Sequence, residues 1–368
     1  MIIGLPKEIK NNECRVGLVA AGVESLVRAG HQVLIERNAG VASGISDVDY
    51  ETVGGEITDT PDMVFAQADM IVKIKEPQPS EYRLIKKDQI IFTYFHFAAN
   101  RELTVSMLDR KITALAYETL STEQGELPCL TPMSEVAGRM AVQEGAKYLE
   151  EPMKGRGILL AGVPGVLPAE VTILGAGVVG SNACKIAAGL GANVTILDIN
   201  LNRLRHLSEI MPPNVHTLMS NSHNIRDAVL KADLVISSVL IRGAKAPCLI
   251  DRELVSQMKK GAVIVDVAID QGGSVQTSRP TTHDNPIYVI DGVVHYCVTN
   301  MPGAVARTST YALTNATFPY ILKVANDGYK KWVKDSREIR TALNMTEGHL
   351  TIKEVADTFD LPLKKLSF

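Results

Sequence analysis

Three glycines near the middle of the chain have a spacing that lets a backbone hold a pyrophosphate. Gly175, Gly177 and Gly180 form a G-x-G-x-x-G pattern directly after the apolar run 171–174. The first glycine allows a tight turn, the second lets the backbone approach the phosphates, and the third lets a helix pack closely on a strand. The phosphates then lie at the positive N-terminus of that helix. The pattern therefore predicts a dinucleotide site.

A carboxylate downstream of the glycines favours one kind of dinucleotide. Asp198 closes the next apolar strand, 194–197, and lies about twenty residues beyond the turn, where a carboxylate accepts a hydrogen bond from a ribose 2′-hydroxyl. Because the same charge repels a 2′-phosphate, we expect NAD rather than NADP. The alternative is a purely structural glycine turn, but the agreement of strand, helix, second strand and acid favours a cofactor site.

Other ionisable side chains follow predicted strands, where a doubly wound sheet binds its ligands. Lys75 ends the predicted strand 70–75, and its ammonium could polarise a carbonyl or hold a carboxylate. His96 lies near the end of the predicted strand 90–97, and neutral imidazole carries protons near pH 7. Simpler interpretations remain open for these side chains. Lys75, like Lys73 on the same strand face, could be a solvated lysine, and His96 could be a core residue whose hydrogen bonds are satisfied.

Arg15 and Asp270 are two further candidates. Arg15 follows the first strand, 1–5, and a guanidinium can hold a carboxylate through two parallel hydrogen bonds, although position alone favours a surface arginine. Asp270 is expected to end the strand 262–270. It could cap a helix, or it could lie beside the nicotinamide and orient a water or ammonia. Ser237 and Ser238 end another predicted strand.

The elements that must position these residues alternate between strand and helix along most of the chain. This alternation predicts an α/β fold whose sheets have parallel strands and helices on both faces. We expect two domains with a cleft between them: a Rossmann, doubly wound NAD-binding domain and a discontinuous α/β substrate domain. The predicted boundaries give residues 1–128 to the substrate domain, 129–305 to the NAD-binding domain, and 306–368 to a helical return to the substrate domain.

Composition excludes several classes of function. The chain has 368 residues and a net charge of −3 with no basic run, so nucleic acid is not an expected partner. No stretch approaches the roughly eighteen apolar residues of a membrane span, and the N-terminus lacks the pattern of a signal peptide. The five cysteines include no C-x-x-C pair, and no metal-ligand spacing is present. These features favour a cytoplasmic protein without a metal.

Several motifs together resemble the alanine dehydrogenase / transhydrogenase NAD-domain family. They are GLPKEIKNNECRVGLVAAGV, KIKEP, YFHFAAN, MSEVAGRMAVQEGAKYLE, the glycine unit and HYCVTNMPGAVARTST. The match is collinear from the N-terminus past residue 330 and is closest to alanine dehydrogenase. It implies a homohexameric enzyme that interconverts L-alanine with pyruvate and ammonium, using NAD.

The resemblance also implies roles for individual residues. Arg15 and Lys75 would hold the substrate, and His96 and Asp270 would be catalytic. The remaining implied positions contact the cofactor: Ser134, Gly175, Gly177, Val178, Gly180, Asp198, Arg203, Ser220, Val239, Leu240, Val267, Ala268, Ile269, Asp270, Arg279, Val298, Thr299, Asn300 and Met301.

The chain departs from the family pattern at few positions. Ala20 and Ala21 stand where Thr-Pro or Val-Pro is common, and Ala306 stands where proline is usual. We expect these to be loop positions at which only backbone stiffness changes.

Three alternative functions remain open from the sequence. The first is the NAD-binding subunit of a transhydrogenase, which would not need Arg15, Lys75, His96 and Asp270 together. The second is a non-catalytic NAD sensor on the same fold. The third is an amino-acid dehydrogenase for a larger substrate, because the sequence does not give the size of the pocket.

Overall fold

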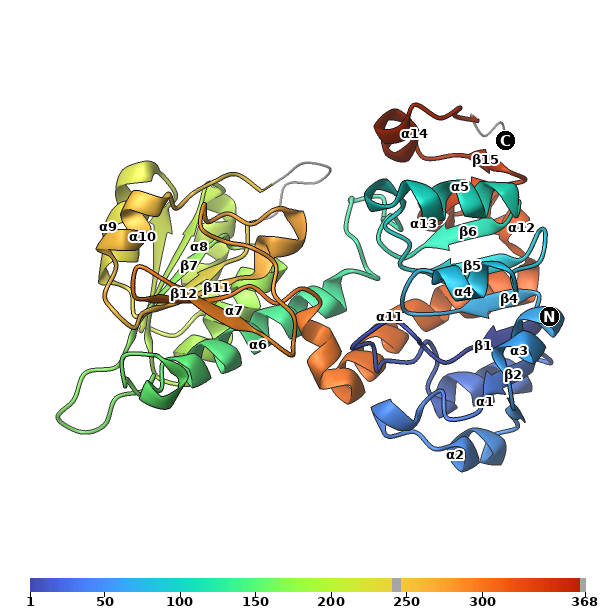
Figure 1. The fold of residues 1–368 in the computed structure, drawn as a ribbon, viewed down its shortest axis with the longest axis horizontal. Coiled ribbons are helices and arrows are strands. Elements are labelled where there is room, and N and C mark those ends of the chain that lie inside the picture. Colours follow the sequence, from blue (N-terminus) through green and yellow to red (C-terminus); the bar gives the residue numbers. More distant parts are fainter. Residues whose placement is uncertain (240–245, 365–368) are drawn as a thin grey trace. The chain divides into compact units, whose positions relative to one another are not determined.

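The structure is a computed structural model that describes residues 1–239 and 246–364 (Figure 1). The chain forms two compact units, one of residues 1–133 with 303–368 and the other of residues 134–302. The boundaries predicted from the sequence lie a few residues away. Helix α6 (Thr131–Tyr148) begins in the first unit and continues into the second, so no loop marks that boundary.

The first unit contains a sheet of eight strands in the order β15-β14-β6-β5-β4-β1-β2-β3. The strands are β1 (Ile2–Leu5), β2 (Gln32–Glu36), β3 (Glu56–Thr58), β4 (Met70–Val72), β5 (Ile90–Thr93), β6 (Thr113–Ala116), β14 (Leu343–Thr346) and β15 (His349–Leu350). Strands β1 to β6 pair in parallel. The carboxyl ends of β1, β4, β5 and β6 therefore lie at one edge of the sheet.

Helices connect these strands and bury their apolar sides on the sheet. They are α1 (Ala20–Arg28), α2 (Asp47–Thr52), α3 (Pro61–Gln67), α4 (Pro79–Tyr82), α5 (Arg101–Asp109), α11 (Ala306–Asp327), α12 (Tyr329–Asp335), α13 (Arg337–Ala342) and α14 (Lys353–Phe359). Helices α3 and α5 bury Phe65, Leu103 and Met107 in one core cluster with Phe95 and Phe97 of the segment after β5.

The second unit contains a sheet of seven strands in the order β12-β13-β11-β10-β7-β8-β9. Its elements after α6 are β7 (Glu170–Leu174), α7 (Val178–Gly189), β8 (Asn193–Asp198), α8 (Leu201–Ile210), β9 (Val215–Met219), α9 (Ser222–Lys231), β10 (Leu234–Ser237), α10 (Arg252–Gln257), β11 (Val263–Asp266), β12 (Ile287–Ile290) and β13 (Val293–Tyr296). All pairs are parallel except β12 with β13. The predicted α/β architecture is confirmed in both units.

Three predicted strands end earlier than expected. Strand β4 ends at Val72, β5 at Thr93 and β11 at Asp266, so that Lys75, His96 and Asp270 lie in the segments that follow. His96 has a φ of +49°, which is incompatible with a strand. Asp270 lies in the 3₁₀ helix η4 (Val267–Gln271). The ladder between β4 and β5 runs a little past both strands, since the Lys73 N–H donates to the carbonyl of Phe92 at 3.1 Å and the Tyr94 N–H to that of Ile74 at 3.3 Å. The apolar residues that follow continue the sequence pattern of a strand outside the strand itself.

Two further expectations are wrong. The C-terminal return is not only helical, because β14 pairs antiparallel with β6 and with β15. Ala20 and Ala21 begin α1 and Ala306 begins α11 rather than lying in loops. Proline is favoured in the first turn of a helix because the backbone N–H it lacks has no partner there. Alanine at these positions therefore keeps the helix start.

Candidate functional site

The glycine turn joins β7 to α7 in the second unit. Gly175 has a φ of +94°, and its N–H donates to the carbonyl of Leu197 at 2.8 Å. A Cβ on Gly180 would lie 1.8 Å from the carbonyl oxygen of Gly175. The first position therefore needs the left-handed backbone freedom of glycine, and the third needs the absence of a side chain.

The turn fits the pyrophosphate of a dinucleotide. Gly177 is the N-cap of α7 and supplies no side chain to cap it, and a Cβ there would meet no atom within 4 Å. The first N–H groups of a helix have no partner inside the helix, and together with the helix dipole they attract anions. The second glycine thus leaves open space beside donors that suit a phosphate.

Asp198 ends β8 beside this turn. Its Oδ2 accepts from the N–H of Ala176 at 2.6 Å, and its Oδ1 accepts from the N–H of Asn200 at 2.8 Å. Since a carboxylate has about four lone-pair sites, it can also accept from a ribose hydroxyl. Arg203 Nε donates to the carbonyl of Ala176 at 2.7 Å and Nη2 to Ser181 Oγ at 3.1 Å. The guanidinium therefore braces the glycine turn.

The other expected cofactor positions of the second unit follow its strands or flank the turn. Val178 begins α7, and the Ser220 N–H donates to the carbonyl of Asp198 at 2.9 Å. Ser134 lies near the start of α6, and Val239 follows β10 after Ser237 and Ser238. Leu240 lies outside the described residues. Ser238 Oγ donates to the carbonyl oxygens of Leu174 and Gly175 at 2.9 and 3.1 Å, which holds β10 to the turn.

The segment after β11 carries Val267, Ala268, Ile269 and Asp270 in η4. A buried carboxylate that the sequence did not single out supports it: Asp266 Oδ2 accepts from the N–H of Ser274 at 3.1 Å. Burial raises the pKa of Asp266 despite several hydrogen bonds. Asp270 is exposed and lies inside η4, so the alternative in which it caps a helix is wrong.

The segment after β13 carries the last expected cofactor residues, Val298, Thr299, Asn300 and Met301. The Thr299 N–H donates to the carbonyl of Thr281 at 3.2 Å, and Asn300 has a φ of +59°. Met301 begins the 3₁₀ helix η5 (Met301–Val305). Arg279 lies over the ring of Tyr288 on β12, with its guanidinium carbon 4.3 Å from the ring centre.

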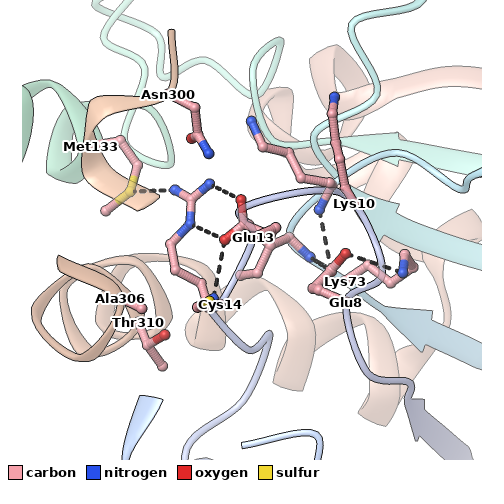
Figure 2. A network of polar contacts seen from close by, with 12 residues as sticks. Glu8, Lys10, Glu13, Cys14, Lys73, Met133, Asn300, Ala306 and Thr310 are labelled. Atoms are coloured by element: carbon pink, nitrogen blue, oxygen red, sulfur yellow. Dashed lines mark hydrogen bonds and ion pairs between the residues drawn. The ribbon is translucent and has the colours of Figure 1, made fainter. Parts of the chain in front are cut away.

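In the first unit, Arg15 is a buried residue and not the surface arginine that its position favoured. Its side chain is 2% exposed, and its Nε and Nη2 donate to the two carboxylate oxygens of Glu13 at 2.6 and 2.5 Å (Figure 2). Nη1 contacts the sulfur of Met133 at 3.0 Å. Burial acts to raise the pKa of Glu13, but the hydrogen bonds and charge of Arg15 outweigh it and leave that pKa low.

Lys73 and Lys75 have different environments. Lys73 is fully buried, with its ammonium 3.2 Å from Glu8 Oε2 and 2.9 Å from Glu81 Oε1 (Figure 2). Burial alone would lower the pKa of Lys73, but these two carboxylates raise it above its usual range. Lys75 is half-buried, and burial followed by the charge of Arg15 lowers its pKa. A substrate carboxylate could therefore pair with the ammonium of Lys75, whereas the ammonium of Lys73 already pairs with two carboxylates.

Glu8 also fixes the backbone at Lys75. Its Oε1 accepts from the N–H of Ile74 at 2.5 Å and from that of Lys75 at 3.3 Å. Thr93 Oγ1 donates to the carbonyl of Lys75 at 2.9 Å. Side chains from both neighbouring parts of the sheet, Glu8 after β1 and Thr93 on β5, therefore fix the backbone of the segment after β4. The position of Lys75 at the sheet edge is fixed with it.

His96 is exposed, so its interpretation as a core histidine is wrong. Its ring lies parallel to that of Tyr94, with centres 5.8 Å apart and planes 6° apart. Tyr94 is buried, and its hydroxyl donates to the carbonyl of Cys129 at 2.6 Å. The N–H of His96 donates to Glu118 Oε1 at 2.6 Å. The imidazole is thus accessible to a ligand while its backbone and one ring face are held.

The first unit thus places Arg15, Lys75 and His96 beyond the carboxyl ends of β1, β4 and β5, which are neighbours in one parallel sheet. This set combines two cations with an accessible imidazole. Such a set can hold a small carboxylate and carry a proton. Sequence reasoning missed the acids that pair with it, and only the position of Glu118 after β6 signalled one of them.

Two kinds of comparison define the family. The N-terminal domain of the alanine dehydrogenase/PNT family matches residues 4–137, and its C-terminal domain matches residues 141–353. An alanine dehydrogenase from Methanococcus maripaludis is 57% identical over 363 residues, which cover 98% of this chain and 97% of that protein.

Solved structures agree with this assignment. An L-alanine dehydrogenase structure has a TM-score of 0.96 and 50% identity, with 98% of this chain and 99% of that chain covered. A transhydrogenase structure from Sinorhizobium meliloti shares the fold at a TM-score of 0.82 and 22% identity, with 96% and 99% covered. No helix in residues 1–239 and 246–364 is long and apolar enough to cross a membrane. By sequence and by fold, the chain belongs to the alanine dehydrogenase/PNT family.

Proposed function

We propose that this chain is an NAD-dependent alanine dehydrogenase, which reversibly converts L-alanine to pyruvate and ammonium. The observation that carries the proposal is the set of Arg15, Lys75 and His96 at one sheet edge of the first unit. A transhydrogenase moves a hydride between nucleotides and needs no carboxylate-binding set with a proton carrier. The alanine dehydrogenases that this chain resembles, at 57% and 50% identity, support the same activity.

The glycine turn would bind NAD through the N–H groups at the start of α7. NAD, when bound, supplies the acceptor for the substrate hydride. Asp198 favours NAD over NADP because its charge lies where a 2′-phosphate would be placed. The segments after β9, β10, β11 and β13 follow strands of the same sheet, and they carry most of the remaining cofactor positions that we propose. Ser134, near the start of α6, is a further one.

Arg15 and Lys75 would bind the substrate carboxylate and carbonyl. Glu13 keeps the guanidinium of Arg15 in one orientation through two hydrogen bonds, which reduces the entropy lost when a carboxylate binds. The low pKa of Lys75 follows first from burial. A bound carboxylate would add a negative charge that stabilises the charged form of this ammonium.

His96 would move protons as water adds to the substrate carbon and the amine leaves. An accessible imidazole suits this task because one of its ring nitrogens can accept a proton while the other donates one. Asp270 is the second catalytic residue of the proposal and would orient the amine or water. Holding reactants in this way supplies part of the rate enhancement.

Initial rates with NADH and ammonium test the proposal. Pyruvate should be reduced much faster than glyoxylate, 2-oxobutyrate or 2-oxoglutarate, and NADPH should be a poor substitute for NADH. Fastest turnover with 2-oxoglutarate would indicate a dehydrogenase for a larger amino acid. Hydride transfer from NADPH to an NAD analogue, without reduction of pyruvate, would indicate a transhydrogenase. NADH binding without turnover of any substrate would indicate a sensor.

The resemblance also leads us to propose a cytoplasmic homohexamer. Light scattering on the purified chain should give about six times the 39.8 kDa mass of one chain. A monomer or dimer at working concentration would contradict this part of the proposal without affecting the reaction.

A further inference from the structure

His96 has a backbone conformation that needs support. Its φ and ψ are 49° and 42°, in the left-handed region, which residues with a side chain rarely occupy. Such conformations persist only where the surroundings impose them, and they gather at functional sites. Because the imidazole itself is exposed, the direction in which it points depends on this backbone conformation.

Glu118 supplies the support. Its Oε1 accepts from the N–H of His96 at 2.6 Å and from the N–H of Phe95 at 3.2 Å, while Oε2 lies 3.3 Å from the Phe95 nitrogen. Glu118 follows β6, whose Ala116 pairs in parallel with Thr93 of β5. One carboxylate therefore binds two consecutive N–H groups at the point where the chain turns out of the sheet.

The residues on either side of His96 are also anchored. Phe95 and Phe97 are buried, and their rings stack with centres 4.4 Å apart. Tyr94 is buried and lies parallel to the imidazole. With its neighbours fixed, the turn at His96 has one remaining requirement, an acceptor for its N–H groups, and Glu118 meets it.

We propose that Glu118 is a positioning residue that holds His96 in its left-handed turn and so aims the imidazole. This inference rests on the proposed role of His96 and adds a residue that acts through it. It assigns to the carboxylate the binding of N–H groups and not the transfer of a proton. A misplacement of about 1 Å in a catalytic group can reduce turnover by on the order of a hundredfold.

Two variants separate positioning from proton transfer. Glu118→Gln keeps an oxygen that can accept from both N–H groups, so turnover should remain within about threefold of the wild type. Glu118→Ala removes the acceptor, so kcat should fall by about tenfold to a hundredfold, while the pyruvate KM and the NADH affinity change little. If Gln costs as much as Ala, the carboxylate itself transfers protons and the inference is wrong.

A double variant tests whether Glu118 acts through His96. In the His96→Ala background, Glu118→Ala should cause no further loss of turnover, whereas independent roles would give multiplied losses. Glu123→Ala is the matched control, because Glu123 is an exposed glutamate of the same connection, and it should retain wild-type kcat. Glu118→Asp, with a shorter side chain, serves as the intermediate variant if Glu118→Ala does not fold.

Hydrogen exchange separates failure of the inference from failure of the proposed function. The amides of Phe95 and His96 should exchange faster in Glu118→Ala and at the wild-type rate in Glu118→Gln. This result is expected even if the wild-type protein does not reduce pyruvate. Unchanged exchange at both amides in Glu118→Ala would overturn the inference.

Discussion

The two units hold their candidate sites in different ways. In the second unit the site is made of backbone: a left-handed Gly175, an uncapped helix start at Gly177, and a Gly180 with no room for a side chain. In the first unit it is made of side chains, Arg15, Lys75 and His96, that buried ion pairs support: Arg15 pairs with Glu13, and Glu8, which pairs with Lys73, holds the backbone at Lys75. The second unit thus offers backbone N–H groups to a phosphate, whereas the first offers charged side chains to a carboxylate.

This difference also determines how each site responds to change. A backbone site fails when a side chain intrudes, because the chain itself must move. A site of paired charges fails when one partner is lost, because a buried charge then remains uncompensated.

Lys73→Met should cost the most stability. It leaves Glu8 and Glu81 as buried carboxylates without their cation, which should lower the free energy of unfolding by about 3–5 kcal/mol. Lys75→Met is the matched control, since Lys75 is half-buried and its pKa is lowered by burial, and it should change stability much less. Urea denaturation measures both variants. Equal midpoints would show that Lys73 does not hold the buried acids.

Gly180→Ala should weaken NADH binding by about tenfold to a hundredfold, since forcing an atom into a filled space typically costs about 1–3 kcal/mol. The new Cβ would lie 1.8 Å from the carbonyl oxygen of Gly175. Gly189→Ala, at the other end of α7, would meet no atom within 4 Å and should leave binding unchanged. NADH fluorescence measures the affinity. Similar affinities for the two variants would rule out the close packing at Gly180.

Lys75 should give the pyruvate KM a pH dependence. Because its pKa is lowered, its ammonium loses the proton at a lower pH than an ordinary lysine, and the KM should rise as pH increases through that value. In Lys75→Arg the cation persists to higher pH, so the KM should begin to rise at a higher pH than in the wild type. This holds even if the KM of the variant is larger at every pH. If the pyruvate KM rises at the same pH in both proteins, the rise comes from a group other than residue 75.

Asp198→Asn should have the smallest effect, a change of cofactor preference. Removing the charge should increase the ratio of NADPH to NADH turnover by about fivefold to tenfold, because two unit charges about 4 Å apart repel by roughly 1 kcal/mol where water screens them fully. Glu209→Gln, which removes the charge of an exposed glutamate from the same unit, is the control. An unchanged ratio in Asp198→Asn would mean that another residue selects the cofactor.

The same contrast explains what the sequence could predict. The turn from Gly175 to Gly180 is local, so its strand, helix and acid could be read from the spacing, and the structure places them as β7, α7 and the end of β8. Arg15, Lys75 and His96 could be selected because they follow strands, although two of those strands proved shorter than expected.

The pairing of charges could not be predicted. Glu8 and Lys73 are 65 residues apart and meet only because β1 and β4 are neighbours in the sheet. The contact of the Glu118 carboxylate with the backbone N–H of His96 has a similar origin, because it forms where β5 pairs with β6. The C-terminal strands β14 and β15 were missed for a similar reason, since they are short and join the sheet from the far end of the chain.

The most direct test of the account is the pyruvate and ammonium reaction of His96→Ala, measured together with its NADH affinity. We expect kcat to fall by about a hundredfold to ten-thousandfold, the usual contribution of a general acid–base group, with the NADH affinity unchanged because the glycine turn lies in the other unit. Wild-type kcat in this variant would contradict the role of His96 and the division of the site between a backbone turn and a charged set.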